Sequence, residues 1–396
     1  MDFCTQMSGL HLLNKIKQEI EKGFDKGFKE NLVVSPLSFS AILNMIAAGS
    51  TGLTFSQMTK FLGCKSYDDI NSKFLELMSI ASPTDDAKHS NGGPVICLVN
   101  GLWVDKQYPL KASYQELVES VYKVQAKTVD LRNEVDRVVE EANEWAKSAT
   151  KGLVTDVLQP CNVTPDTKLI LGNALYFKGC WEEKFNAKST KNLDFYLLNG
   201  DRISAPFMTG CNTYTQGSYD GFEVVKIPYQ RGKQDRKAFS FFIFLPNEID
   251  GLQKLLETAT SDPGFFSQHF QLIHRTYDIF RIPKFKFAYR TAEGPQTIKD
   301  MGLCLPFMED CRELTGLVDT KNEPFFVSEI VQKAFIEVDE VGTEAAAVSI
   351  FDMACGCSRY YEPTRFVADH PFMFMIREEE SRSVLFTGAV LNPLLK

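Results

Sequence analysis

The chain has 396 residues, of which 44% are hydrophobic and 24% charged, and its formal net charge is −8 at pH 7. These proportions are typical of a soluble globular protein, and the length allows two or three ordinary domains or one large fold. The acidic balance argues against nucleic acid as a partner, because phosphate neutralisation needs an excess of lysine and arginine. No stretch approaches the roughly 18 apolar residues of a membrane-spanning helix, so we expect no membrane span.

Amphipathic helices are predicted where apolar residues recur every three or four positions. One such pattern covers residues 8–28. An apolar helix is predicted after Pro36, which follows a short β-branched strand, and it ends at Gly49, with the proline and glycine typical of a helix start and stop. Further helices are predicted at residues 65–80 and 136–151, and the second of these is amphipathic.

Strands are predicted where β-branched and aromatic residues gather in short runs. The run at residues 167–185 contains Asn173 and Trp181, and the run at residues 279–289 has the two-residue period of a single strand. The remaining predicted strands lie at residues 95–105, at several places in 205–246, at 331–338, from 366 onward, and at 384–393.

The segment between the predicted strands at 331–338 and 366 is the most unusual part of the sequence. Residues 339–342 form a charged, glycine-containing break where a hairpin would normally return. The chain instead continues through the small side chains of residues 343–349, which can fit between two existing strands. A connection of about twenty residues in a compact domain is uncommon and tends to be functional. The alternative interpretation is an alanine-rich helical turn followed by a surface loop.

Several motifs, in this order along the chain, resemble the serpin family of serine protease inhibitors, near its intracellular-type, ovalbumin-like branch. They are the Asn-x-Leu-Trp at residues 100–103, the GTEAAA at 342–347, the FVADHPFMFMI at 366–376 and the VLFTGAVLNP at 384–393. The resemblance covers residues 8–393. It implies an α+β serpin fold with three β-sheets and about nine helices, as a single domain over residues 1–396. It also implies an exposed reactive-centre loop at about residues 340–364.

The resemblance implies an inhibitory serpin, in which a protease cleaves the loop, is held as an acyl-enzyme, and is trapped when the loop enters the central sheet. The residues assigned to the hinge of this loop are Glu340, Gly342, Thr343, Glu344, Ala345, Ala346 and Ala347. A charge at Thr343 would be costly to bury, and threonine avoids it. Glu344 and Ser349 are expected to point outward from the inserted strand. The alternatives are a non-inhibitory carrier or chaperone, for which proline, charge or bulk in the hinge would be expected, and an inhibitor of a cysteine protease.

The resemblance also assigns residues beneath and beside the opening of the central sheet. Those of the shutter and breach regions are Ser35, Ser38, Asn173, Trp181 and Gln332. Inhibitory relatives commonly carry a histidine at the position of Gln332. Glutamine keeps part of the hydrogen bonding but cannot become protonated, which puts any pH-sensitive opening in doubt.

The scissile bond is predicted by two methods that disagree. Counting from Gly342 by the family pattern gives Gly356–Cys357, whereas counting back from Pro371 gives residues 358–360. We favour Arg359–Tyr360, because Arg359 is the only basic residue in the loop and a guanidinium pairs with the carboxylate of a trypsin-like pocket. Phe351 or Met353 would instead suit chymotrypsin-like or elastase-like enzymes.

No catalytic or metal-binding motif accompanies this loop. The five histidines form no HExxH motif and lie near no GxSxG motif. Cys355 and Cys357, with Cys304 or Cys311, lack the two close pairs of a typical zinc site, although a redox effect of the two loop thiols stays open. We therefore expect no enzyme activity, no metal and no cofactor.

The expected partner is a target serine protease, bound covalently. Heparin activation is not expected, because residues 65–80 mix acidic and basic side chains. The family implies a monomer with a polymerisation hazard, in which the loop of one molecule enters the sheet of another. Residues 1–20 do not match a cleavable signal peptide and the ten cysteines are scattered, which favours a cytoplasmic protein or one exported without a cleaved signal to the extracellular space or cell surface.

Overall fold

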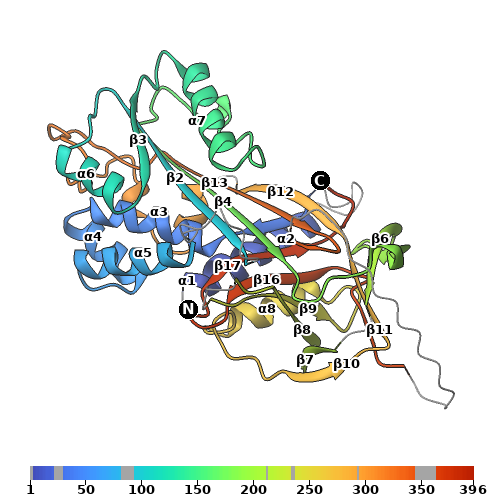
Figure 1. Cartoon of the computed structure of the whole chain (residues 1–396). Helices are drawn as coiled ribbons and strands as arrows, with labels where there is room; N and C mark the ends of the chain where they lie inside the picture. The colour runs from blue at the N-terminus through green and yellow to red at the C-terminus, as the bar shows by residue number, and fades with distance from the viewer. Residues whose placement is uncertain are drawn as a thin grey trace.

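The computed structural model describes residues 3–21, 30–81, 93–210, 213–232, 237–291, 294–343 and 363–396. These residues form three β-sheets and a set of helices that packs around them (Figure 1). Helices α3 to α6 gather at one end of the central sheet, whereas β6 and β11 lie at the other end (Figure 1). The expected α+β fold with three sheets is confirmed.

The helices begin and end close to the predicted positions. Helix α3 begins at Pro36, where the Ser35 hydroxyl accepts a hydrogen bond from the Ser38 amide at 3.1 Å, and it is followed by Gly49. The predicted N-terminal helix consists of a π-helical turn at Gln6–Leu10 followed by α2. Residues 22–29 of this prediction are not among the residues that the structure describes. The α-helices are α1 Phe3–Thr5, α2 His11–Glu21, α3 Pro36–Ala48, α4 Gly52–Leu62, α5 Tyr67–Ala81, α6 Ala112–Ser120, α7 Val135–Ala149, α8 Leu252–Ser261 and α9 Gly294–Asp300.

The central sheet has the strand order β12-β13-β14-β4-β2-β3. These strands are β12 Phe285–Thr291, β13 Glu329–Val338, β14 Gly342–Thr343, β4 Leu169–Cys180, β2 Val95–Asp105 and β3 Val124–Val129. Helix α7 covers one face, where Ala174 and Phe335 belong to the same small core as Ala142. Leu171 and Leu175 belong to the main core on the opposite face. Alternate residues of β4 and β13 are therefore buried on opposite faces, as the two-residue period of a strand requires.

Two further sheets complete the fold. The seven-stranded sheet has the order β1-β17-β16-β9-β8-β7-β10, and the four-stranded sheet has the order β15-β11-β6-β5. The strands of the first are β1 Leu32–Val34, β17 Val384–Val390, β16 Phe372–Glu378, β9 Phe239–Pro246, β8 Phe222–Pro228, β7 Thr213–Tyr219 and β10 Ile273–Thr276. The strands of the second are β15 Arg365–Val367, β11 Ile279–Pro283, β6 Arg202–Gly210 and β5 Lys191–Tyr196.

The prediction of one strand at residues 279–289 is wrong. The chain forms β11 in the four-stranded sheet and β12 in the central sheet, with Lys284 between them. Burial falls on even positions in β11, at Phe280 and Ile282, and on odd positions in β12, starting at Phe285. This change of phase lets one segment serve two sheets. The run from residue 366 divides in the same way into β15 and β16.

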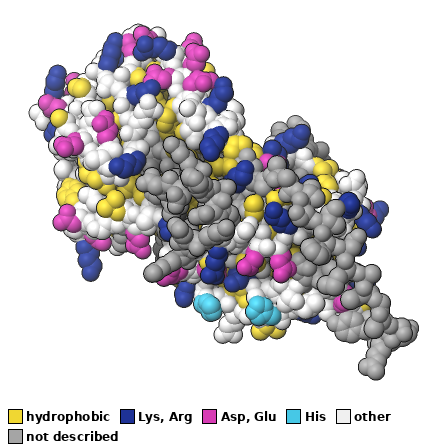
Figure 2. All heavy atoms as spheres, in the orientation of Figure 1, with side chains coloured by type: hydrophobic (Ala, Val, Ile, Leu, Met, Phe, Trp, Pro, Cys, Tyr) yellow, Lys and Arg dark blue, Asp and Glu magenta, His cyan; other side chains and the backbone are white. Residues whose placement is uncertain are grey.

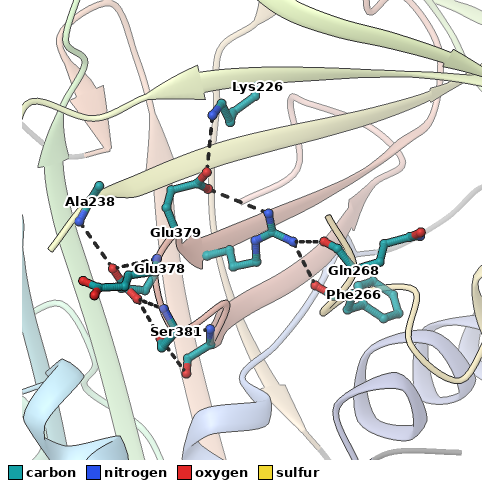
Figure 3. Close-up of polar contacts among 10 residues, drawn as sticks. Lys226, Ala238, Phe266, Gln268, Glu378, Glu379 and Ser381 are labelled. Atoms are coloured by element: carbon teal, nitrogen blue, oxygen red, sulfur yellow. Dashed lines mark hydrogen bonds and ion pairs between the residues drawn. The ribbon is translucent and has the colours of Figure 1, made fainter. Parts of the chain in front are cut away.

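A buried charged network fixes the end of β16 (Figure 3). Arg377 donates to the carbonyl oxygens of Phe266 at 3.3 Å and Gln268 at 2.9 Å, and burial lowers the pKa of its guanidinium. Glu378 accepts from the Ser381 amide at 2.6 Å (Figure 3). Burial opposes ionisation of Glu378, but hydrogen bonds outweigh it and lower the pKa of this carboxyl. These noncovalent contacts hold β16 to the segment that follows α8.

Candidate functional site at the mouth of the central sheet

Strands β13 and β4 are paired along part of their length and separated at one end. Their parallel pairing runs from Glu329 opposite Ile170 to Phe335 opposite Tyr176, and we call this paired region the seam. Beyond the seam, β14 lies between them, with Gly342 opposite Cys180 and Thr343 opposite both Gly179 and Val338. We call this end the mouth. The first residues of the predicted loop thus already lie inside the sheet.

Both residues of β14 are constrained by close packing. A Cβ atom on Gly342 would lie 1.9 Å from the carbonyl oxygen of Gly179, so only glycine fits there. Thr343 is 1% exposed, and its hydroxyl lies 2.7 Å from the hydroxyl of Tyr229. Burial raises the pKa of Tyr229, which keeps this partner neutral. Thr343 is therefore a buried, hydrogen-bonded residue on the same face as the main core.

Trp181 joins the end of β4 to the turn before β14. Its indole Nε1 donates to the carbonyl oxygen of Asp339 at 2.8 Å, and its backbone amide donates to the carbonyl oxygen of Val341 at 2.9 Å. The indole also stacks on the ring of Tyr229, with centroids 4.7 Å apart. The Asp339 carboxylate accepts from the amides of Val341 at 2.8 Å and Gly342 at 3.1 Å. Burial raises the pKa of Asp339 despite these bonds.

Glu340 anchors the same turn from its other side. Its carboxylate accepts from the Lys284 ammonium at 2.7 Å and from the Thr190 hydroxyl at 2.6 Å. Its carbonyl oxygen accepts from the Phe185 amide at 2.9 Å. Burial opposes ionisation of Glu340, but the bonds from Lys284 and Thr190 outweigh it, so the pKa of Glu340 lies below its ordinary value. Lys284, Thr190 and Tyr229 could not be assigned to this site from the sequence, since nothing in their local sequence indicates where β14 will lie.

We expect Glu340→Gln to lower the free energy of unfolding by about 1–3 kcal/mol at neutral pH, because it removes the charge facing Lys284. A lowered pKa in the folded state means that the ionised carboxylate stabilises the fold above the ordinary pKa of glutamate. That contribution is lost as the pH falls through the lowered pKa. The difference between wild type and variant should therefore shrink on acidification, as measured by urea unfolding at a series of pH values.

Glu337→Gln is the matched control for this prediction. Glu337 pairs with the exposed Lys286 at 2.9 Å, and exposed ion pairs contribute about 0–1 kcal/mol. A Glu340→Gln variant as stable as Glu337→Gln at neutral pH would contradict an anchoring role for Glu340.

In the middle of the seam, Asn173 and Gln332 lie opposite each other and both are buried. The Asn173 amide nitrogen donates to the Asn100 side-chain oxygen at 2.6 Å, and the Thr291 hydroxyl donates to the Gln332 oxygen at 2.9 Å. Among the described residues, the Asn173 oxygen and the Gln332 nitrogen have no hydrogen-bond partner. The seam thus encloses an unpaired acceptor and an unpaired donor at the same level, and such groups cost free energy when buried.

Of the two serines assigned to the shutter, Ser35 directly precedes α3 and Ser38 lies in its first turn, and α3 packs against β4. The Ser35 hydroxyl is used as the helix cap. The Ser38 hydroxyl is buried and has no hydrogen-bond partner in the described part of the chain. The structure therefore brings these serines under the sheet, but within the described residues neither hydroxyl forms a hydrogen bond with Asn173 or Gln332.

The predicted scissile residues lie outside the described residues, and so does most of the hinge. They are Arg359, Tyr360, Gly356 and Cys357 for the bond, and Glu344, Ala345, Ala346 and Ala347 for the hinge. Within the residues that the structure describes, no three His, Cys, Asp or Glu side chains gather as metal ligands. No helix in those ranges has the length and apolar character needed to cross a membrane. On the face in Figure 2, basic and acidic side chains are interspersed.

The start of the loop, β14, lies between two strands that are otherwise paired with each other. This arrangement is that of proteins whose central sheet can accept an additional strand. The chain belongs to the serpin family, since the family model described as "Serpin (serine protease inhibitor)" matches residues 9–393. The curated relatives include Serpin-Z10 of Arabidopsis thaliana, which is 40% identical over 367 residues, or 92% of each chain. Serpin-Z2B of Triticum aestivum is 37% identical and is matched over 90% of its length and 92% of this chain.

Solved structures agree with this assignment. The native stressed conformation of Arabidopsis AtSerpin1 superposes with a TM-score of 0.84 at 36% identity, covering 100% of this chain and 99% of that one. Uncleaved ovalbumin has a TM-score of 0.78 at 21% identity over 99% of this chain and 100% of its own, which shows the fold alone. The serpin prediction is confirmed, whereas the resemblance to the ovalbumin-like branch stays a prediction.

Proposed function

We propose that this protein is an inhibitory serpin that acts as a suicide substrate of serine proteases, most specifically of trypsin-like enzymes. The protease serine attacks a carbonyl carbon in the loop, an ester forms, and the peptide nitrogen leaves with the C-terminal segment. The segment after Thr343 then extends β14 between β13 and β4 and carries the acyl-enzyme with it before water cleaves the ester. The observation that carries the proposal is β14, because its two residues already occupy the mouth.

The register of β14 predicts where each further residue would fall in the inserted strand. Thr343 lies opposite Gly179 on β4 and Val338 on β13, so Ser349 would fall opposite Asn173 and Gln332. Ser349 would share the buried face of Thr343, because both have odd numbers and strand side chains alternate. In this proposal Ser349 would point inward, rather than outward as expected from the sequence alone, whereas Glu344 would keep its expected outward direction. The Ser349 hydroxyl, which can donate and accept, would then meet the unpaired groups of Asn173 and Gln332.

Insertion is favourable because the single ladder between β13 and β4 is replaced by two ladders, one on each side of the inserted strand. Insertion replaces the parallel pairing of the seam with two antiparallel ladders and buries the apolar residues of the loop. The small side chains of residues 345–347 can enter without clashes. The charged network at the end of β16 would keep the C-terminal strands attached after the cut. The free energy gained on insertion makes the trapping step effectively irreversible.

We propose Arg359–Tyr360 as the scissile bond, with Gly356–Cys357 as the alternative. The guanidinium of Arg359 suits the carboxylate at the base of a trypsin-like pocket. The scattered cysteines favour a reducing compartment such as the cytoplasm as the site of action.

The test is incubation with trypsin, chymotrypsin and elastase, followed by denaturing gels and mass spectrometry of the C-terminal fragment. The expected result is a denaturation-resistant complex with trypsin and a fragment that begins at Tyr360. A fragment that begins at Cys357 would keep the inhibitory mechanism and reject the proposed bond. Cleavage without any complex, and without a gain in heat stability, would reject inhibition.

A further inference from the structure

At the end of the seam far from the mouth, Lys168 connects the two sides of the sheet. It directly precedes β4, and its backbone amide donates to the Ser328 hydroxyl at 2.9 Å, while the Ser328 amide donates to the Leu169 carbonyl oxygen at 3.0 Å. The Lys168 ammonium donates to the carbonyl oxygen of Pro324. Since Pro324 and Ser328 lead into β13, these bonds cross from the β4 side to the β13 side.

Two aromatic rings enclose the same ammonium group. It lies 5.3 Å from the centroid of Tyr108 and 5.1 Å from that of Phe326, which is within the range of cation–π attraction. Burial lowers the pKa of Lys168, and the neighbouring carboxylate of Glu323 acts in the opposite direction. Glu323 in turn accepts from the Tyr108 hydroxyl at 3.2 Å. Lys168 is therefore held by several partners and is partly withdrawn from water.

The position of Lys168 matters because of the path that an inserting strand must take. If the strand continued from Thr343 in the observed register, it would run antiparallel to β4 toward Leu169. To complete this path it must pass between Lys168 and the segment of Pro324 and Ser328. The mouth is already open around β14, whereas this far end is closed by a cation held between two rings and a carbonyl group.

We propose that Lys168 is a latch at the far end of the seam that limits the completion of loop insertion, an inference that rests on the proposed inhibitory function. Lys168 touches neither protease nor scissile bond, so it is a positioning residue. While the latch is closed, a partly inserted acyl-enzyme is exposed to water and can be hydrolysed, which releases active protease. Opening of the latch lets the strand complete the sheet and traps the enzyme. The latch therefore sets how the cleaved chains divide between complex and free product.

The test compares wild type with Lys168→Met, which keeps the apolar stem but removes the bond to Pro324 and the charge over the rings. The protease is the one among trypsin, chymotrypsin and elastase with which wild type gives measurable amounts of both covalent complex and free cleaved protein. The ratio of complex to cleaved product on denaturing gels is expected to rise about three- to tenfold, which corresponds to the loss of one charge-assisted hydrogen bond and its ring contacts. The intact variant should also unfold at a lower urea concentration.

Three further variants separate the latch from a general loss of stability. Lys254→Met is the matched control, since Lys254 is an exposed residue on α8 away from the seam. Lys168→Arg keeps the cation over the rings and should bring the ratio back toward wild type. If Lys168→Met does not fold, Phe326→Leu, which removes one ring, should raise the ratio in the same direction by a smaller factor.

Different results would reject the latch and the proposed inhibitory function. If Lys168→Met loses stability but gives the same ratio of complex to cleaved product as Lys254→Met, Lys168 has only a structural role and the latch is rejected. If the ratio falls, Lys168 assists insertion and the latch is also rejected. If wild type is cleaved by every protease without forming a complex, the inhibitory function itself fails.

Discussion

Thr343→Arg is expected to convert the protein from an inhibitor into a substrate, with the yield of covalent complex falling at least about tenfold while cleavage of the loop continues. Thr343 is 1% exposed and its hydroxyl is paired with that of Tyr229. An arginine there would place an unpaired charge against the main core, at a cost of several kcal/mol. The protease would then be released by hydrolysis before the loop could enter the sheet. Denaturing gels and the number of inhibitor molecules consumed per protease molecule measure this change.

Two controls accompany this variant. Thr343→Ser keeps the hydroxyl that faces Tyr229 and should retain most of the complex. Thr258→Arg introduces the same charge on the exposed surface of α8 and should behave as wild type. A Thr343→Arg variant that still forms complex at the wild-type yield would show that Thr343 is not buried during inhibition. The extension of β14 could then not be the trapping step.

Much of the fold follows from local patterns in the sequence. Pro36 and Gly49 mark the start and end of α3 because the first lacks an amide proton and the second suits a helix end. The alternation of β13 predicts a strand that the structure confirms at Glu329–Val338. The small residues after Gly342 indicated entry into a sheet, and the structure places the first of them there. Patterns of this kind depend only on neighbouring residues.

The parts that could not be predicted depend on distant residues. Glu340 lies 56 positions from Lys284 and 150 from Thr190 in the chain, yet both bind its carboxylate. The division of residues 279–289 into two strands depends on which sheet each half joins. The pairing of Asn173 with Gln332 follows from strand order. Local sequence carries no information on these contacts, because tertiary packing decides them.

The register of β14 also predicts that two positions in the loop differ sharply in their tolerance of charge. Ser349 would fall on the buried face opposite Asn173 and Gln332, whereas Glu344 would fall on the outer face opposite Lys178 and Glu337. We therefore expect Ser349→Lys to reduce the complex at least about tenfold, because the ammonium would be buried beside two amides without a counter-charge. Glu344→Lys introduces the same side chain and should stay within about twofold of wild type.

The cleaved proteins give an independent measurement of the same register. Wild type cleaved in the loop should resist heat much better than the intact chain, because a complete sheet has replaced the seam. Ser349→Lys should show little of this gain after cleavage, and Glu344→Lys should show nearly all of it. Ser349→Ala should lose about 1–3 kcal/mol of the gain, because the Asn173 oxygen and the Gln332 nitrogen would remain unpaired. Equal effects of lysine at residues 344 and 349 would mean that the inserted strand does not keep the register of β14. The polar pair in the seam would then need another partner.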